Sequence, residues 1–416
     1  MKKNVCDVLA AYAASSPFYR TAGVSRDCFR SMIANGPCIK KHDLQTQTTL
    51  ILNDSYKHLD FNLFQVSRTS GSSGEPVEVF WSQDEYFRSN MDLWRLRKKY
   101  YDIMPSDKCV SFHSILYNKS KPMLHKKIIK LNYGKILSFS KFNLSDQDMD
   151  YYLKEICKYE PKWMLTQPSV IFKILDFLER YDRKLPNSLL YIELNGEQVS
   201  YEQEMCLRNK LKVNVANLYG SQEVNAIGYE CSHGNMHIVS DNVYVQMYDV
   251  AETENSISGS ILVSNLHNRV FPIIAYDLGD RITIRKSNRC PCGCNSPIID
   301  SIWGRKSDDI ILPNGKKISP FLFSYCIEYL NSAMGNPIWQ YKVKTQKDKI
   351  TLVVYISNNF SRWADSIKKE LEIKIFEMIP GAGEINISIK PLTDIMISNS
   401  GKKKMVDRSE QLKDPM

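Results

Sequence analysis

The stretch Ser67-Arg68-Thr69-Ser70-Gly71-Ser72-Ser73-Gly74-Glu75-Pro76 is the most informative part of the sequence. Residues 69–74 are all small or hydroxylated, so they offer no large apolar side chain to a core. Their backbone N–H groups can form a nest for an anion, and their hydroxyl groups can donate hydrogen bonds to phosphate oxygens. The stretch is not a Walker loop, because the terminal Gly-Lys-Ser/Thr is missing. Taken alone, it predicts either a phosphate-binding loop or an ordinary flexible turn.

Helix and strand patterns downstream of this stretch predict an α/β fold. Apolar residues recur at helical spacing over 84–101 and 168–181. Short apolar runs over 189–194 and 213–218 are each closed by a glycine turn, as strands often are. A strand, a glycine turn, a helix and another strand in succession are typical of an α/β sheet with its site at the strand ends.

The character of the sequence changes after Arg305. Alternating apolar and polar residues predict strands over 339–343, 350–356 and 385–389. A helix is predicted over 361–378, with an apolar face on one side. That face carries Trp363, Ile367, Leu371, Ile375 and Met378. About 105 residues with strands and helices of their own predict a small second domain of α+β type.

The composition is that of an ordinary folded protein. The chain has 416 residues, of which 43% are hydrophobic and 24% are charged, and this excludes intrinsic disorder, collagen and coiled-coil arrays. At about 100–200 residues per domain, the length predicts two to three domains. No stretch approaches the roughly 20 apolar residues of a membrane helix. Because Asp7 interrupts the short apolar run after Lys3, neither membrane insertion nor secretion is expected.

Cysteine and histidine residues gather in two short segments, although the 11 cysteines are otherwise widely spread. An odd, dispersed set argues against a disulfide framework and predicts a reducing cytoplasm. The two segments are Cys231-Ser232-His233 with nearby His237, and Cys290-Pro291-Cys292-Gly293-Cys294. Thiolate and imidazole are typical zinc ligands, and four of them close a tetrahedral structural site. The alternative, a loop of free thiols, would leave three oxidisable cysteines side by side.

The formal net charge of +9 would suit an anionic partner such as a nucleic acid, a membrane surface or a nucleotide. Much of the excess lies over 119–135 and 402–404, where the lysines can equally form solvated faces. A nucleic-acid-binding protein with a zinc knuckle is the alternative from another functional class. RNA binders usually interleave aromatic with basic residues, and the basic stretch shows no regular pattern of that kind. No nucleic-acid partner is therefore expected.

Four further segments carry residues suited to a nucleotide. Tyr219-Gly220-Ser221-Gln222-Glu223 follows a predicted strand, and its ring could stack on a base while its carboxylate holds magnesium. Tyr276-Asp277-Leu278-Gly279-Asp280 places an acid after a turn, where it could bind two ribose hydroxyls. Gly304-Arg305-Lys306-Ser307-Asp308-Asp309 sets an arginine beside two carboxylates. Ser400-Gly401-Lys402 puts a lysine in a polar loop.

In order and spacing, these five segments resemble the adenylate-forming superfamily of acyl-CoA synthetases and adenylation domains. Within it, the chain is most similar to the phenylacetate–CoA ligase branch, which includes adenylating proteins tied to capsule and O-antigen synthesis. Supporting details are Ser16-Pro17-Phe18-Tyr19-Arg20, Asn195-Gly196-Glu197 and the Cys/His insertion at about 231–294. The resemblance covers nearly the whole chain. The motifs are weak singly, but the ordered set is specific.

The resemblance implies a role in ATP binding for two groups of residues. The first group would grip the β- and γ-phosphates: Thr69, Ser70, Gly71, Ser72, Ser73 and Gly74. The second group would surround the rest of the nucleotide: Gly196, Glu197 and Tyr219 at the adenine, Gly220, Ser221 and Gln222 beside them, and Asp280 at the ribose. Gln222 stands where the family usually has Thr, Leu278 replaces a frequent Thr, and Glu75 replaces a frequent Lys. These departures leave activity open, because none removes an indispensable charge.

Three residues would act on the reaction itself if the resemblance holds. Glu223 would bind Mg²⁺, Arg305 would contact ribose or phosphate, and Lys402 would reach the α-phosphate and carboxylate oxygens. A carboxylate must attack the α-phosphorus against anionic repulsion, so positioning and a local cation supply the catalysis. The alternative for Lys402 is a solvated tail lysine, and Lys403 and Lys404 are competing choices.

For zinc, the resemblance suggests Cys231, His237, Cys290 and Cys292 as the ligands of a structural ion. His233 and Cys294 remain as substitutes. His113 and Tyr117 follow a strand-like stretch and could line an acyl pocket, or His113 could be an ordinary structural histidine.

The resemblance implies a large ATP- and carboxylate-binding domain over 1–305, a hinge over 306–309 and a mobile lid over 310–416. It implies a bacterial cytoplasmic enzyme that adenylates a carboxylic acid and then transfers the acyl group to coenzyme A or another thiol. The capsule-associated relatives suggest a role in surface polysaccharide synthesis. The alternatives are an amide-forming ligase with an amine acceptor and a catalytically silent nucleotide-binding relic. A homodimer stays open, since the sequence shows no interface.

Overall fold

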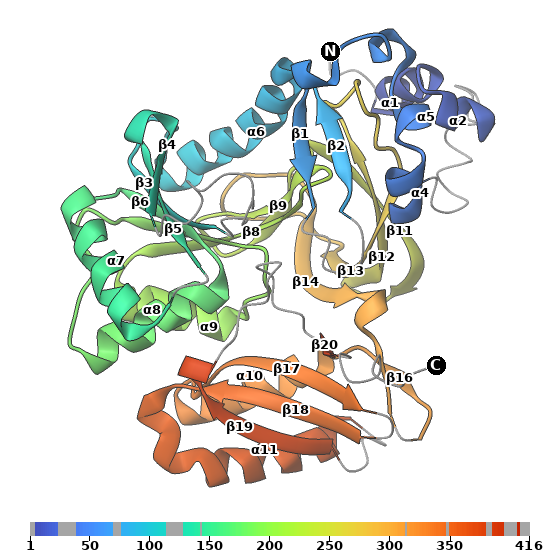
Figure 1. The fold of residues 1–416 in the computed structure, drawn as a ribbon. Helices are drawn as coiled ribbons and strands as arrows, with labels where there is room; N and C mark the ends of the chain where they lie inside the picture. Colours follow the sequence, from blue (N-terminus) through green and yellow to red (C-terminus); the bar gives the residue numbers. More distant parts are fainter. Residues whose placement is uncertain are drawn as a thin grey trace, which may run out of the picture. The chain divides into compact units, whose positions relative to one another are not determined.

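A computed structural model describes residues 5–23, 39–69, 76–113, 128–141, 144–312, 314–346, 349–379, 385–394 and 406–407. The chain forms two compact units, one from Met1–Pro105 and Asn217–Trp303 and the other from Ser106–Ala216 and Gly304–Met416. Both units contain helices and strands (Figure 1), so the predicted α/β class is confirmed. The domain boundary at 305, the hinge and the lid stay predictions.

The strands of the first unit follow the order β11-β12-β13-β14-β10-β9-β8. Pairing is antiparallel along β11, β12 and β13, and again from β14 through β10 and β9 to β8. These strands are β8 (Asn214–Ser221), β9 (Asn225–Glu230), β10 (Met236–Ile238), β11 (Val243–Glu252), β12 (Ser256–Asn265), β13 (Tyr276–Arg285) and β14 (Ile298–Arg305). The helices of this unit are α1 (Val5–Ala14), α2 (Pro17–Thr21), α4 (Lys41–Thr46), α5 (Thr48–Ile51) and α6 (Gln83–Tyr101). Apolar side chains of α1, α2 and the strands form one buried core that includes Leu9, Tyr19, Ile261 and Phe271.

A separate hairpin of β1 (Gln65–Arg68) and β2 (Glu78–Trp81) brackets the glycine- and serine-rich stretch. Arg68 lies opposite Glu78 in its antiparallel register. One step further, the Thr69 N–H donates to the Val77 carbonyl at 3.0 Å, and the Val77 N–H donates to Thr69 Oγ1 at 2.8 Å. The two ends of the stretch are therefore held together. Residues 70–75 lie outside the described residues.

Helix α6 matches the helix predicted over 84–101, and its ends show why it forms there. The Ser82 hydroxyl accepts from the Glu85 N–H at 3.2 Å, which caps the first turn. Acidic residues occupy the first turn and basic residues the last, where each sign favours the helix dipole. The helix ends at Asp102, which adopts a left-handed backbone conformation.

In the first part of the second unit, the strands follow the order β7-β6-β3-β5-β4. Strands β7, β6, β3 and β5 run parallel, and β4 pairs antiparallel with β5. The bounds are β3 (Cys109–His113), β4 (Ile128–Leu131), β5 (Ile136–Ser140), α7 (Asp146–Tyr159), β6 (Trp163–Thr166), α8 (Pro168–Arg180), β7 (Tyr191–Asn195) and α9 (Tyr201–Leu211). The predicted helix at 168–181 and the strand that follows it are confirmed as α8 and β7.

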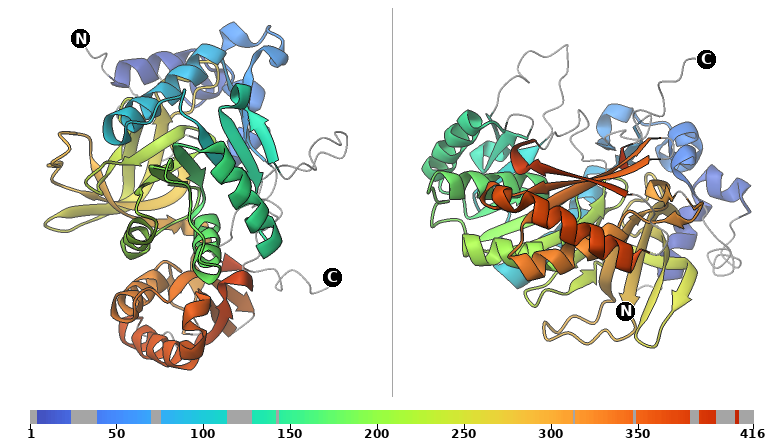
Figure 2. Two further views of the ribbon diagram at one scale, coloured as in Figure 1. Left: turned by 90° about the vertical axis from the view of Figure 1, so that its left-hand side faces the viewer. Right: turned by 90° about the horizontal axis from the view of Figure 1, so that it is seen from below.

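The rest of the second unit contains a four-stranded sheet of order β19-β18-β17-β20. Helices α10 and α11 cover one face of this sheet (Figure 2) and share a core with it. The bounds are β15 (Ile310–Ile311), β16 (Lys317–Ile318), α10 (Leu322–Met334), β17 (Ile338–Gln346), β18 (Lys349–Ile356), α11 (Ala364–Met378), β19 (Ile385–Pro391) and β20 (Val406–Asp407). The three strands predicted after Arg305 are confirmed.

The apolar face predicted for 361–378 is partly wrong. Ile367, Leu371 and Ile375 are buried, but Trp363 is 47% exposed and Met378 is 42% exposed. The chain runs as a 3-10 helix over Asn358–Trp363 before α11 begins at Ala364. A 3-10 helix has three residues per turn, so an α-helical period does not extend across this junction.

Glu328 of α10 is a partly buried carboxyl group, and it gives a pH-dependent prediction. Burial, together with the negative charge of Glu202 on α9, raises the pKa of Glu328 to about 7. A raised carboxyl pKa stabilises the fold at low pH, and this contribution is lost as the pH rises from about 4.5 to 7. We therefore expect Glu328→Gln to raise the melting temperature at pH 8 by about 3 °C, with a smaller change at pH 5. An equal shift at both pH values would contradict this assignment.

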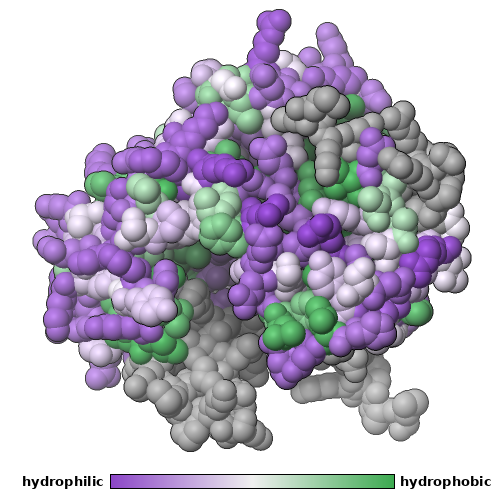
Figure 3. Space-filling model, turned by 90° about the horizontal axis from the view of Figure 1, so that it is seen from above, coloured by the Kyte–Doolittle hydropathy of each residue, from purple (hydrophilic) through white to green (hydrophobic). Residues whose placement is uncertain are grey.

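Among the described residues, no helix is both long and apolar enough to cross a membrane. On the face drawn in Figure 3, hydrophilic residues predominate and hydrophobic residues form small separate patches. Scattered apolar residues of this kind are common on protein surfaces.

Candidate nucleotide site and metal centre

The end of β8 and the turn that leads to β9 carry the motif Tyr219-Gly220-Ser221-Gln222-Glu223. It is tight, because a Cβ atom at Gly220 would lie 2.6 Å from the Asn225 carbonyl oxygen. Glycine is therefore required at position 220 by a close backbone approach. Asn225 adopts a positive φ of 63°, which asparagine tolerates better than most residues. Local backbone chemistry thus fixes the turn that presents Glu223.

Tyr219 and Asp280 lie together, although 61 residues separate them in sequence. The Tyr219 hydroxyl donates to Asp280 Oδ2 at 2.7 Å. Asp280 is buried on β13, and the Tyr219 side chain is partly exposed. The structure thus brings a flat ring and a carboxylate into one place, as a site for a base and a ribose requires.

Glu223 is buried, with 7% of its surface exposed. Its Oε1 accepts a hydrogen bond from the Tyr276 hydroxyl at 3.2 Å. Within the described part of the chain, no lysine or arginine pairs with this carboxylate. Because a buried charge is costly unless it is compensated, a bound cation would stabilise Glu223. Carboxylate oxygen is a preferred ligand of Mg²⁺, so the residue fits the predicted magnesium role.

Gly196 and Glu197 follow β7 in the second unit. Gly196 adopts a φ of 75°, which places a turn directly after the strand. The Glu197 carboxylate accepts from the Ser169 N–H at 2.9 Å and from the Ser169 hydroxyl at 2.8 Å. Ser169 lies in the first turn of α8, where a negative charge favours the helix dipole. Glu197 therefore has a structural partner, and its contact with adenine stays a prediction.

The other predicted site residues lie at the ends of strands, beside the loop 70–75 or outside the described residues. Arg305 ends β14 and is exposed. Lys402 and the loop residues 70–74 lie outside the described residues, as does Tyr117. Thr69 lies at the edge of that loop, and its hydroxyl oxygen already accepts from Val77. The hydroxyl proton of Thr69 remains available to a phosphate oxygen. His113 is the last residue of β3, and its role in an acyl pocket stays a prediction.

Four side chains of the first unit form a compact cluster: Cys231, His237, Cys290 and Cys292. Their ligand atoms all lie within 4.8 Å of one another. Cys231 Sγ is 3.7 Å from Cys290 Sγ, and Cys292 Sγ is 3.3 Å from His237 Nε2. In a tetrahedral site with zinc–sulfur bonds of about 2.3 Å, two sulfur ligands lie about 3.8 Å apart. Both the donor set and its spacing therefore fit Zn²⁺.

The surroundings of the cluster favour metal binding. His237 Nδ1 lies 3.1 Å from the Ser296 carbonyl, so a proton on Nδ1 leaves Nε2 free to face the sulfur atoms. The Asn235 amide donates to Cys290 Sγ at 3.4 Å, as the Cys294 N–H does to Cys292 Sγ. Burial raises the pKa of the Cys231 thiol, which keeps it protonated unless a metal displaces the proton. The substitutes His233 and Cys294 contribute no ligand atom to the cluster among the described residues.

Two interactions of the site were not apparent from the sequence. Tyr276 stands in the same motif as Asp280, and nothing in that motif indicates that the Tyr276 hydroxyl binds Glu223. Ser169 precedes an apolar helix stretch and reads as an ordinary first-turn serine. Both pairings depend on which strands and helices become neighbours.

The chain resembles one curated protein in sequence and several solved ligases in structure. No family model matches the chain. Protein CapK of Staphylococcus aureus is 21% identical over 312 residues, which span 74% of this chain and 66% of CapK, just under two thirds of its length. The structure of 2-hydroxyisobutyryl-CoA ligase in its postadenylation state with 2-HIB-AMP has a TM-score of 0.74 at 16% identity, covering 98% of this chain and 89% of that one. The anthranilate CoA ligase AuaEII with anthranoyl-AMP has a TM-score of 0.54 at 11% identity, covering 81% and 65%. The chain therefore shares the fold of these adenylate-bound ligases.

Proposed function

We propose that this protein uses ATP to adenylate a carboxylic acid, releasing pyrophosphate, and then transfers the acyl group to coenzyme A or another thiol. The observation that carries the proposal is the pairing of Tyr219 with Asp280 and of Tyr276 with Glu223 in one unit of a ligase fold. These pairs combine a ring, a ribose-binding acid and a buried carboxylate. ATP with Mg²⁺ requires such groups.

Each of these side chains has a proposed task. The Tyr219 ring stacks on adenine, and Asp280 accepts hydrogen bonds from the ribose hydroxyls while Tyr219 holds its other oxygen. Glu223 binds Mg²⁺, which when present neutralises part of the phosphate charge. Gly196 and Glu197, in the turn after β7, also contact adenine in this proposal. Gly220, Ser221 and Gln222 supply the backbone and amide groups beside the α-phosphate.

The remaining tasks fall to the loop 69–74, Arg305 and Lys402. The loop donates N–H and hydroxyl groups to the β- and γ-phosphates, and Arg305 contacts ribose or phosphate. Lys402 stabilises the negative charge that develops when the acid attacks the α-phosphorus. Residues 310–416 act as a lid that is hinged at 306–309 and alternates between the two half-reactions.

A test of the lysine assignment uses the run of three lysines at 402–404. We expect Lys402→Ala to slow adenylate formation about a hundredfold, because one group at a developing charge is worth that much. Lys403→Ala is the matched control, with an expected change of less than about twofold, as for a solvated side chain. If Lys403→Ala is the slow variant, the register of the tail is wrong.

Zn²⁺, bound by Cys231, His237, Cys290 and Cys292, is proposed as a structural ion, since protein atoms would fill all four positions. A reducing cytoplasm would keep these thiols available. A homodimer is a further possibility, and the mass of the protein in solution tests it.

The acyl acceptor and the pathway are proposed from the relatives. The 2-hydroxyisobutyryl-CoA ligase has been solved with 2-HIB-AMP and CoA, which supports coenzyme A as the acceptor. The similarity to CapK supports a role in surface polysaccharide synthesis, where an amine acceptor and an amide product are the alternative. A catalytically silent nucleotide-binding protein is the second alternative.

Pyrophosphate exchange tests the proposal directly. Purified protein is incubated with ATP, Mg²⁺, radiolabelled pyrophosphate and one acid from a panel of aryl, fatty, amino and uronic acids. Exchange that depends on one class of acid supports adenylation and identifies that class, and adding coenzyme A or amines then identifies the acceptor. ATP binding without exchange would favour the silent alternative. Absence of ATP binding would overturn the proposal.

A further inference from the structure

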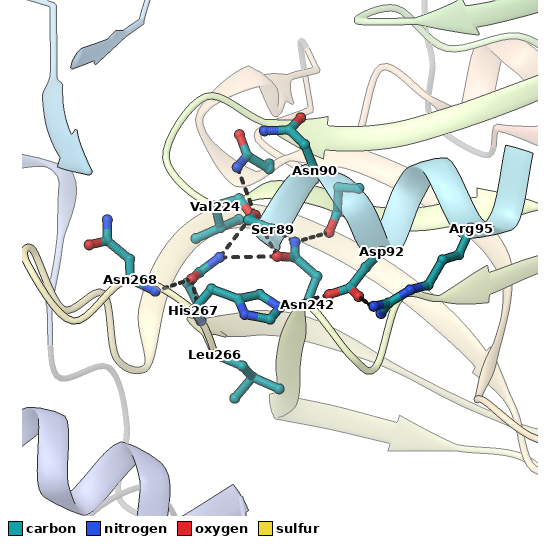
Figure 4. A network of polar contacts seen from close by, with 12 residues as sticks. Ser89, Asn90, Asp92, Arg95, Val224, Asn242, Leu266, His267 and Asn268 are labelled. Carbon is teal, nitrogen blue, oxygen red and sulfur yellow. Dashed lines mark hydrogen bonds and ion pairs between the residues drawn. The ribbon is translucent and has the colours of Figure 1, made fainter. Parts of the chain in front are cut away.

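The backbone directly after Glu223 is held by a buried side chain that the nucleotide motifs do not include (Figure 4). Asn242 is fully buried. Its Nδ2 donates to the Val224 carbonyl at 2.9 Å and to the Ala226 carbonyl at 2.7 Å. One amide group therefore donates to the carbonyl groups of the two residues on either side of Asn225.

Three more side chains complete what we call the Asn242 network, which consists of Ser89, Asn225, Asn242 and Asn265. The buried Ser89 hydroxyl on α6 donates to Asn242 Oδ1 at 2.6 Å and accepts from Asn225 Nδ2 at 2.8 Å. Asn265, also fully buried, donates from Nδ2 to the Val224 carbonyl at 3.1 Å. Segments far apart in sequence thus converge on 224–226.

The network is anchored beyond the turn. The Asn265 side-chain oxygen accepts from the N–H groups of His267 and Asn268, at 2.9 and 2.8 Å. His267 Nε2 lies 2.7 Å from Asp92, a carboxylate of α6 that is 5% exposed (Figure 4). Helix α6 and the loop after β12 are therefore tied to each other as well as to the turn.

Burying polar side chains costs free energy unless each donor and acceptor forms a hydrogen bond. The Asn242 amide meets this condition, because both of its N–H groups and its oxygen form hydrogen bonds. An apolar contact would be enough to bury the start of β9. Hydrogen bonds fix direction as well as distance, so they determine how the peptide after Glu223 is oriented. The Tyr276 hydroxyl fixes the carboxylate end of the same residue.

We propose that the Asn242 network is a positioning device for Glu223, which sets the direction of its carboxylate toward Mg²⁺. This inference rests on the proposed function, because it assigns Glu223 to the metal. Ser89, Asn242 and Asn265 touch neither metal nor nucleotide in it. They act through the backbone of 224–226.

Two substitutions weaken the network to different degrees. Ser89→Ala removes two of its hydrogen bonds but leaves both donations from Asn242 to the turn. Asn242→Ala removes those two donations. We expect the Mg²⁺ concentration for half-maximal pyrophosphate exchange to rise about threefold in Ser89→Ala and about tenfold in Asn242→Ala. The adjacent Asn90 donates to the Tyr86 carbonyl of its own helix, so Asn90→Ala is the matched control with no expected change.

A second readout does not depend on turnover. The melting temperature is measured with ATP in buffer without added Mg²⁺ or chelator and again with ATP and Mg²⁺, and the difference reports Mg²⁺ binding. We expect this difference to shrink in Ser89→Ala and Asn242→Ala but not in Asn90→Ala. Activity is compared at a temperature well below the melting point of each variant. Should Asn242→Ala not fold, Ser89→Ala carries the test.

The outcomes separate the two proposals. A lower melting temperature with unchanged Mg²⁺ dependence in Ser89→Ala would show that the network is merely structural and would overturn the inference. If the native protein neither exchanges pyrophosphate nor gains stability from ATP with Mg²⁺, the proposed function fails and the positioning role fails with it.

Discussion

Glu223→Gln is expected to lower kcat/KM for acid-dependent pyrophosphate exchange about a thousandfold, the upper end for loss of one preorganised electrostatic contact. The substitution keeps the size of the side chain, and the amide oxygen can still accept from the Tyr276 hydroxyl. It removes the negative charge that attracts Mg²⁺ into a buried position. The fold should therefore persist while the metal-dependent step is lost.

The measurement that checks this result is exchange activity over a wide range of Mg²⁺ concentration, with the melting temperature of each variant. Glu252→Gln is the matched control, because Glu252 is an exposed glutamate of the same unit that pairs with Lys286 at 3.1 Å. Its exchange activity should not change. Glu223 has no metal role if Glu223→Gln needs the same Mg²⁺ concentration as the native protein and keeps its rate.

Much of the fold could be predicted because local patterns match local structure. Helix α6 was predicted to within one residue at its start, since Ser82 caps it and its charges follow the dipole. The strands after Arg305 were predicted from their alternation. The prediction failed at Trp363, where a 3-10 helix changes the period of the chain before α11 begins. The spacing of apolar residues therefore predicts that a helix or strand is present more reliably than it predicts the residue at which it begins.

The site was predicted as a set of motifs, but the contacts between motifs were not. Tyr219 meets Asp280, and Tyr276 meets Glu223, across separations of 61 and 53 residues. These pairings depend on which strands become neighbours, and that is decided by the packing of the whole unit. Asn242 is the clearest example of a residue whose role could not be predicted from the sequence. Asparagine is usually exposed, but Asn242 is fully buried.

The metal centre gives the largest expected effect on stability. Cys231 directly follows β9, His237 lies in β10, and Cys290 and Cys292 lie between β13 and β14. An ion bound by all four would join the β9–β10 hairpin to a segment about 50 residues away and close a long loop, which reduces the entropy of the unfolded chain. The residues from 286 to 297 form no helix or strand, so the ion would add a constraint to a segment that is otherwise held by separate hydrogen bonds.

We therefore expect the purified protein to carry about one zinc ion per chain and to melt about 10 °C lower when a chelator removes it. Cys292→Ser should release zinc to the same chelator at a much lower concentration. Cys294→Ser and His233→Ala are matched controls, because both residues lie beside the cluster without contributing a ligand atom to it. Zinc content by elemental analysis, and the thiolate absorption of a Co²⁺-substituted sample, measure binding apart from activity. If Cys294→Ser loses zinc while Cys292→Ser retains it, the proposed ligand set is wrong. If the purified protein contains no zinc and its melting temperature does not change in chelator, zinc does not contribute to its stability.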